Sequence, residues 1–428
     1  MKDQKEMLLH WIEDDRDKLV DFLSHFIQAK SPNPPGDTRA AAAHIRQFLD
    51  EKALPYRIIA PQEEMPNIVG SFECGASGRH LVLNGHTDVF PVGDTVGWTY
   101  DPWGGTVADG RVYGRGAADM KCGTTASIFT FAYLHRIRDR LKGRLTLTCV
   151  SDEENFGPWG TRYLMEHHPE IHGDCCLNGE PSNPYIIHFG ERGLIWLAFT
   201  VHTRGGYGPH THMAQNAIKI ATQLIADLEV LSEIQVLIPA DIDAVLRRNA
   251  EVINQVQGKE TSEIVRKVTV NIGTIRGGLK VNMVPSECVV EADIRLPMGL
   301  DKGRMMAEVE KIALRYPEVS CKEINYAPPN WCEPYGVMVK FIRANVKALR
   351  SFEPEPFISL GGTDAKRWRY LNVPAYLYGP FPRNICAANE YVEIEEFLHI
   401  VKTHVLSAYD YLTLSDSKIG PYNTGNEI

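Results

Sequence analysis

The stretch Leu81–Val89, LVLNGHTDV, joins an apolar run directly to a group of polar side chains. Residues 81–83 predict a buried strand that stops at Asn84. In open α/β sheets, ligands bind at the carboxyl ends of the strands. His86 and Asp88 lie at that end and share a face if the strand continues through them. Either both side chains bind a cation, or Asp88 holds the imidazole from behind; the alternative is an ordinary strand-to-loop turn.

Length, charge and cysteine content limit the class of protein. A chain of 428 residues exceeds what one hydrophobic core usually organises, so we expect two domains. The net charge of -9 argues against nucleic acid or an anionic membrane as the main partner. No apolar run approaches the length of a membrane span. Nine cysteines, an odd number, and a charged, amphipathic amino-terminal segment predict a cytoplasmic protein with reduced thiols.

Further segments end in acidic residues in the same way. The apolar run 145–150 leads into Ser151-Asp-Glu-Glu154, and the run 175–177 leads into Asn-Gly-Glu180. Asp119 follows a glycine-rich turn and precedes a predicted helix over 124–136. Strands that alternate with helices predict an α/β fold with a doubly wound sheet, here expected to be mixed.

The pattern changes after Gly193. Strands are predicted at 194–203, 268–275 and 288–296, with helices at 216–231 and 302–316. This arrangement is typical of a smaller α+β domain with an antiparallel sheet. Strand–helix alternation resumes from about Trp331. We therefore predict a first domain formed by residues 1–191 and 329–428, with an inserted domain over 192–328.

The acidic residues and His86 all lie at the same predicted edge of one sheet. Carboxylates brought that close repel one another unless a cation or a proton intervenes. One histidine with several carboxylates suits one or two divalent ions of zinc, manganese or cobalt. Each acidic residue also has a structural alternative: Asp119 as a helix cap, Glu153 and Glu154 as a solvated loop, and Glu180 as a turn residue.

The motifs also carry a resemblance. The chain resembles the aminoacylase / glutamate carboxypeptidase / succinyl-diaminopimelate desuccinylase family of co-catalytic metallohydrolases. The matching motifs follow the family's order and span nearly the whole chain: Ser31-Pro-Asn-Pro-Pro-Gly36, Gly85-His-Thr-Asp88, Gly114-Arg-Gly-Ala-Ala-Asp-Met-Lys121, Asp152-Glu-Glu154, Gly179-Glu-Pro181 and Gly361-Gly-Thr-Asp-Ala365.

This resemblance implies a metal centre made of one histidine and several carboxylates. The implied roles are His86 and Glu180 on one ion, Asp119 between two ions, Glu154 on the second ion, Glu153 as general base on the activated water, and Asp88 behind His86. It also implies that the inserted domain is a lid and a dimerisation surface, so we expect a homodimer or higher homo-oligomer.

Substrate contacts are implied in the same manner. Asn282 and Arg295 resemble contacts to a substrate carboxylate, and Gly361 and Gly362 resemble a loop that admits the substrate backbone. The alternative for Arg295 is a salt bridge at the end of a strand. For the two glycines, the alternative is an ordinary turn between a strand and a helix.

Two positions depart from the family pattern. Cys386 occupies the place of the histidine that closes the second metal site; it is either a thiolate ligand or a small buried residue beside a vacated site. Tyr207 occupies the place of a lid histidine that is thought to polarise the scissile carbonyl. A phenol can donate a hydrogen bond to an oxyanion, and His210 or His212 could instead take over, or both could be simple loop histidines.

The leading hypothesis is a metal-dependent hydrolase of a C–N bond in a small carboxylate-bearing substrate. An N-acyl amino acid or dipeptide is the default. The two departures favour a non-peptide amidase or aminohydrolase with a single ion. A non-catalytic ligand-binding relative is the alternative from another class, and the retained Glu153 argues against it.

Overall fold

Four parallel strands form the centre of the sheet in the computed structural model, which describes residues 2–414. They are β6 (Lys142–Val150), β3 (Ala76–His86), β7 (Cys175–Asn178) and β17 (Ala375–Leu377), adjacent in that order. Antiparallel strands extend the sheet on both sides: β2 (Asn67–Glu73) and β1 (Tyr56–Ile59) beside β6, and β8 (Ile186–Glu191) beside β17. The sheet is therefore mixed, as predicted.

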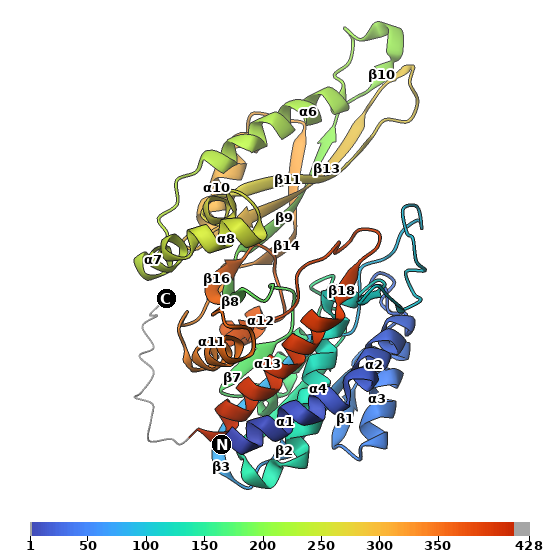
Figure 1. Cartoon of the computed structure of the whole chain (residues 1–428). Helices are drawn as coiled ribbons and strands as arrows, with labels where there is room; N and C mark the ends of the chain where they lie inside the picture. Colours follow the sequence, from blue (N-terminus) through green and yellow to red (C-terminus); the bar gives the residue numbers. More distant parts are fainter. Residues whose placement is uncertain (1, 415–428) are drawn as a thin grey trace. The chain divides into compact units, whose positions relative to one another are not determined.

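Helices cover both faces of this sheet. Val82 of β3 packs with Leu164 of α5 (Thr161–His167) and Trp368 of α12 (Ala365–Arg369). Its neighbours Leu81 and Leu83 point to the opposite face, because side chains alternate along a strand. There α4 (Cys122–Arg136) and α13 (Ile394–Thr413) contact β3 and run side by side (Figure 1). The prediction of a doubly wound α/β sheet is confirmed.

Apolar residues recur at helical spacing over residues 4–29, but the helix in this region is interrupted. The structure has α1 (Lys2–Asp14) and α2 (Arg16–Gln28), with Asp15 outside helical geometry between them. The carboxylate of Asp15 accepts hydrogen bonds from Lys18 and from the hydroxyl of Tyr133, and these contacts accompany the break. Two further helices belong to this part of the chain: α3 (Arg39–Glu51) and α11 (Val337–Arg350).

A second, antiparallel sheet has the strand order β11 (Thr269–Gly277), β13 (Glu287–Leu296), β9 (Gly193–His202) and β14 (Val319–Ala327). The inward residues of β9 and β13 form one core with α6 (Ala217–Leu228) and α10 (Lys302–Ala313). This is the predicted α+β arrangement. Strand β14 was not predicted, because it is largely exposed at the edge and lacks apolar alternation.

Shorter elements complete the chain. The polar stretch 238–262 contains α7 (Ala240–Arg248), α8 (Ala250–Gln257) and the start of α9 (Thr261–Ile264). A two-stranded ribbon pairs β10 (Gly206–Tyr207) with β12 (Met283–Val284), and a three-stranded sheet has the order β18 (Tyr391–Glu393), β5 (Arg111–Tyr113), β4 (Thr106–Ala108). Within residues 2–414, no helix is both long and apolar enough to cross a membrane.

The described residues form two compact units. One comprises residues 2–189, 332–356 and 363–414, and the other comprises residues 190–331 and 357–362. The segment 357–362, which includes Gly361 and Gly362, therefore groups with the second unit rather than with the first domain, where we had placed it. A backbone hydrogen bond from Arg192 to the carbonyl of Ser359, with N···O 3.1 Å, accompanies this grouping.

Candidate metal centre

The carboxyl ends of the parallel strands bring the predicted site residues to one edge of the sheet. His86 is the last residue of β3, and β6 leads directly into the segment 151–154. Strand β7 ends two residues before Glu180. Asp119 reaches the same place from the turn that precedes α4. Four segments far apart in sequence thus supply the polar side chains at this edge.

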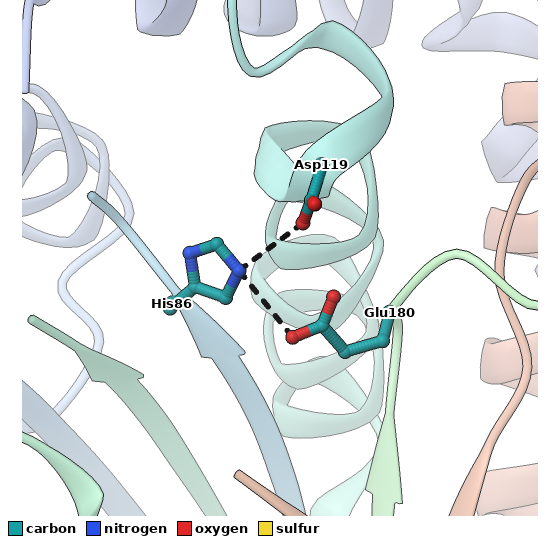
Figure 2. Close-up of side chains that lie close together, drawn as sticks. All are labelled: His86, Asp119 and Glu180. Atoms are coloured by element: carbon teal, nitrogen blue, oxygen red, sulfur yellow. Dashed lines mark ion pairs between the residues drawn. The ribbon is translucent and has the colours of Figure 1, made fainter. Parts of the chain in front are cut away.

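His86 lies at the centre of the group. Its Nε2 is 3.3 Å from a carboxylate oxygen of Asp119 and 3.3 Å from one of Glu180, as Figure 2 shows. One carboxylate oxygen of Glu153 lies 3.9 Å from the same nitrogen. None of these contacts has hydrogen-bond geometry, although Nε2 is fully buried. One atom each from His86, Asp119 and Glu180 lie within 4.8 Å of one another.

The other ring nitrogen of His86 fixes how the imidazole presents itself. Nδ1 lies 2.9 Å from the main-chain carbonyl oxygen of Asp88. A carbonyl oxygen only accepts, so Nδ1 carries the proton and donates it. A neutral imidazole held in this way directs the lone pair of Nε2 toward the carboxylates of Asp119 and Glu180, as a metal ligand requires.

The carboxylate of Asp88 supports a different segment. Its nearer oxygen is 3.7 Å from His86 Nδ1. The two carboxylate oxygens instead accept hydrogen bonds from the backbone N–H groups of Glu153 (3.3 Å) and Glu154 (3.1 Å). Asn33 donates its side-chain amide to the same carboxylate at 2.9 Å. Asp88 therefore contacts His86 through its carbonyl and the two glutamates through its carboxylate, a division that sequence reasoning missed.

The electrostatics of the group are those of crowded, buried acids. Burial raises the pKa of Glu153 and of Glu154 well above the ordinary value and raises that of Glu180 to about 7. Burial alone would lower the pKa of His86, but the charge of Glu180, the close contact with the carboxylate of Asp119 and the charge of Glu153 outweigh it and raise the pKa well above 6.5. A divalent cation among these atoms would favour the ionised carboxylates and the neutral imidazole.

These residues fit a divalent cation. One imidazole nitrogen and two carboxylate oxygens are a donor set that zinc, manganese and cobalt accept. The orphaned, buried Nε2 of His86 is the atom that such an ion would satisfy. Across residues 2–414, this is the one group of three or more histidine, cysteine or acidic side chains with ligand atoms so close together.

Glu154 and Cys386 stand beside this group without joining it. One carboxylate oxygen of Glu154 is buried without a hydrogen-bond partner, and after burial the charge of Asp119 contributes most to its raised pKa. Cys386 is exposed, in the segment between β17 and β18, with a φ of 60°. Desolvation and the charge of Asp119 raise the pKa of its thiol to about 11. The charge of Asp119 thus raises the pKa of both side chains. The binding of a second ion by Glu154 and Cys386 stays a prediction.

A buried amide network lies beneath the ligands. The side-chain oxygen of Asn178 accepts the backbone N–H of Glu180 at 2.7 Å, and its amide donates to Asn84 at 2.7 Å. Asn84 donates in turn to the hydroxyl of Thr148 at 3.1 Å. Three parallel strands are thereby linked just before their site residues. The available signal was an asparagine two residues before both His86 and Glu180, at the end of an apolar strand.

In the second unit, four of the predicted residues gather at the β10–β12 ribbon. Tyr207 pairs with Met283, and Gly208 donates its N–H to the carbonyl of Asn282 at 3.0 Å. The ring of His210 lies 5.6 Å from that of Tyr207 and 5.9 Å from that of His212, between centroids. Tyr207, His210, His212 and Asn282 therefore belong to one exposed surface.

Arg295 is not part of that surface. It lies near the end of β13, which begins three residues after the ribbon, so about 26 Å of strand separates it from the ribbon. Its guanidinium forms a two-nitrogen ion pair with Asp293, at 3.0 and 2.8 Å. The structure thus contains the strand-end salt bridge, and within the chain it does not bring Arg295 to Asn282.

Gly361 and Gly362 lie in the turn between β16 (Glu355–Ser359) and α12. The nearest atom that a Cβ at Gly361 would meet is the hydroxyl oxygen of Ser359, 4.0 Å away. The packing of the chain does not itself require glycine there.

A doubly wound sheet whose strand ends hold a histidine among buried carboxylates defines a metallohydrolase class of fold and site. Residues 82–409 match the model of the peptidase family M20/M25/M40, and the chain belongs to this family. It is 27% identical over 359 residues to a succinyl-diaminopimelate desuccinylase of Cereibacter sphaeroides, covering 81% of this chain and 87% of that protein.

Solved structures share the fold. The chain is similar to the M20 family metallo-carboxypeptidase Sso-CP2 from Sulfolobus solfataricus, with a TM-score of 0.80, 17% identity and coverage of 92% of this chain and 99% of that one. It is also similar to the dipeptidase Dug1p of Saccharomyces cerevisiae, with a TM-score of 0.79, 15% identity and coverage of 97% and 100%. The protein is a metal-dependent hydrolase of C–N bonds.

Proposed function

We propose that the protein hydrolyses the amide bond of a small, carboxylate-bearing N-acyl amino acid or dipeptide. The similarity to succinyl-diaminopimelate desuccinylases supports this substrate class. In this proposal His86, Asp119 and Glu180 hold a divalent ion. When bound, the ion lowers the pKa of a water molecule and polarises the carbonyl that the water attacks.

Glu153 acts as the general base in this proposal. One of its carboxylate oxygens lies 3.9 Å from His86 Nε2, and the other is buried without a hydrogen-bond partner. Asp88 holds the backbone of Glu153 in place. A carboxylate so positioned can take the proton of the attacking water and pass it to the leaving nitrogen. The position of Glu153 beside the three-ligand group is the observation that carries the proposal.

Replacement of Glu153 by glutamine tests this role. Glu153→Gln keeps the shape of the side chain and removes its basicity, so we expect kcat to fall at least about 100-fold. Zinc content and the melting temperature should stay close to those of the wild type. The assay would use a panel of N-succinyl amino acids, N-acetyl amino acids and dipeptides.

The exposed Glu395→Gln variant is a matched control, and its turnover should equal that of the wild type. Unchanged turnover in Glu153→Gln would refute the assignment of the base. Absence of turnover in the wild type across the whole panel, together with tight binding of one of these compounds, would favour a ligand-binding relative.

The second unit supplies the proposed substrate contacts. Tyr207, His210 or His212 would donate a hydrogen bond to the carbonyl oxygen as negative charge develops on it. Arg295 would contact the substrate carboxylate. Asn282, which one chain does not bring to Arg295, would make such a contact only from a second copy of the chain. The open space at Gly361 supports the proposal that the substrate backbone approaches the chain there.

A single ion and a non-peptide substrate form the second candidate function. The close group of ligand atoms contains His86, Asp119 and Glu180 but neither Glu154 nor Cys386, among the described residues. Such a site favours a non-peptide amidase or an aminohydrolase, in which water displaces an amino group. Metal stoichiometry separates the two candidates.

Plasma mass spectrometry of the wild type and of Cys386→Ala, purified without chelator, gives that stoichiometry. Two ions in the wild type and one in the variant would make Cys386 a ligand and support the two-ion amidohydrolase. The Cys386 thiolate can change the number of bound ions only if it ligates an ion in the second site. One ion in both proteins would support the single-ion candidate.

We also propose that the protein is a homodimer associated through the second unit. The apolar side chains of Met213, Leu279 and Val281 lie in loops beside the β10–β12 ribbon and are 70%, 90% and 100% exposed. Exposed apolar groups of this kind mark protein–protein contacts.

A further inference from the structure

A buried ion pair joins the segment after Cys386 to the turn that carries Asp119. Arg115 Nη1 donates to a carboxylate oxygen of Glu390 at 2.7 Å, and the two side chains are 2% and 1% exposed. Neither residue has a role in the proposed chemistry. Because taking two charges out of water is energetically costly, a fully buried pair of this kind needs further contacts to compensate.

The other carboxylate oxygen of Glu390 supplies those contacts. It accepts the backbone N–H of Ala118 at 2.9 Å and that of Asp119 at 3.1 Å. The main-chain carbonyl of Glu390 accepts the N–H of Gly114 at 2.9 Å. Glu390 therefore binds both ends of the glycine-rich turn: its carbonyl accepts a hydrogen bond from Gly114, and its carboxylate accepts hydrogen bonds from Ala118 and from Asp119 itself.

Arg115 also forms a hydrogen bond to the segment that carries Cys386. Its Nη2 donates to the carbonyl oxygen of Ala387 at 3.3 Å. Its backbone N–H donates to the carbonyl of Pro102 at 2.8 Å, which fixes the arginine in the turn. Immediately beyond Glu390, β18 pairs with β5, so the two segments stay together along the chain.

We propose that Glu390 and Arg115 are positioning residues that hold Asp119 as a metal ligand and make the site depend on the docking of residues 386–390. The inference rests on the proposed metal site at His86, Asp119 and Glu180. Hydrogen bonds to an ionised carboxylate are stronger than those between neutral groups. The hydrogen bond from the Asp119 N–H to Glu390 therefore fixes the backbone position from which the Asp119 side chain extends. Partners that orient ligands contribute about 10- to 100-fold to metal affinity.

The test uses the full-length chain and the variant Glu390→Gln. Glutamine keeps the shape and an oxygen for the two N–H groups, but it removes the charge that faces Arg115. Zinc affinity of the metal-free protein is measured by competition with a chromophoric chelator. We expect about 10- to 100-fold weaker binding in the variant and an altered visible absorption spectrum of the Co²⁺-loaded protein.

Two further variants frame the result. Asp119→Asn removes a proposed ligand and should abolish tight binding of zinc. Glu395→Gln makes the same chemical change five residues along, at an exposed ion pair with Arg16, and should leave zinc affinity and the Co²⁺ spectrum unchanged. The melting temperature of each metal-free variant reports stability separately, since a purely structural role of Glu390 would lower it without changing either metal readout.

The outcomes distinguish this inference from the proposed function. Loss of zinc binding in Asp119→Asn, with wild-type affinity and spectrum in Glu390→Gln, overturns the inference and leaves the metal site standing. A wild-type protein that binds neither zinc nor cobalt overturns both. If Glu390→Gln does not fold, Arg115→Lys replaces it; it retains a positive charge but shortens the reach to Ala387, and unchanged zinc affinity in that variant overturns the inference.

Discussion

Single buried amides determine where the ligand-bearing segments begin. Asn178 satisfies the backbone N–H of Glu180 and the side-chain oxygen of Asn84 at once. Both asparagines are completely buried. A buried polar group that loses its partner destabilises the fold by about 1–3 kcal/mol. Removal of the Asn178 amide leaves two such groups without a partner, the N–H of Glu180 and the side-chain oxygen of Asn84.

Asn178→Ala should therefore lower the free energy of unfolding by about 2–6 kcal/mol. Urea denaturation of the metal-free protein measures this change, which keeps metal binding out of the comparison. Asn271→Ala is the control, because Asn271 is exposed on β11 and no such network surrounds it. A loss no greater than that of the control would mean that the amide network does not stabilise the strand ends.

Helix α13 carries two buried histidines that are held neutral. Burial lowers the pKa of His404 to about 4, and its Nε2 donates to the carbonyl of Tyr378 at 2.7 Å. Burial, then the positive charges of Arg350 and Lys402, lower the pKa of His399 to about 3. The hydroxyl of Tyr378 contacts His399 Nε2 at 2.8 Å. Protonation of either histidine is therefore unfavourable in the folded state.

These low pKa values make the protein less stable in mild acid. Above pH 6.5 both histidines are neutral in the folded and unfolded states, and their contribution is complete. As the pH falls from 6.5 toward 4, only the unfolded chain binds the protons, so the free energy of unfolding decreases. At pH 5 each histidine has cost up to about 2 kcal/mol.

His404→Gln removes one group that binds a proton in the unfolded chain between pH 6.5 and 4. Glutamine keeps an amide donor for the carbonyl of Tyr378. Its loss of stability between pH 7 and pH 5, measured by urea denaturation, should be smaller than that of the wild type by up to about 2 kcal/mol. His10→Gln, at an exposed position on α1, should lose as much as the wild type. Equal losses in all three proteins would contradict the assignment.

At the scale of the whole molecule, the exposed apolar loops of the second unit bear on assembly. A surface that associates with its own copy about a two-fold axis closes into a dimer. Light scattering after size-exclusion chromatography should give twice the 48.0 kDa of one chain. The double variant Leu279→Asp/Val281→Asp should shift the mass to that of the monomer, because charge in the contact opposes association.

Val96→Asp provides the control for this prediction, since Val96 is 82% exposed in a loop of the first unit. It should behave as the wild type. A monomeric wild-type protein at micromolar concentration, or a double variant that stays dimeric, would refute association through these loops.

Local patterns in the sequence sufficed for the fold and for much of the candidate site. Apolar runs such as 81–83 and 145–150 specify strands by composition alone. Their polar ends specify which residues meet at the carboxyl edge, because parallel strands end together. His86, Asp119, Glu153 and Glu180 could thus be placed near one another without coordinates.

Tertiary structure alone decided how those residues are held. The Asp88 carboxylate accepts a hydrogen bond from the backbone of Glu153, and the Glu390 carboxylate accepts one from the backbone of Asp119. Arg295, by contrast, is remote from Asn282. All three facts depend on how segments that are distant in sequence pack together. Periodicity reports only which face a residue occupies within its own element. Hydrogen bonds between elements follow from packing distances and side-chain directions, and these exist only once the chain has folded.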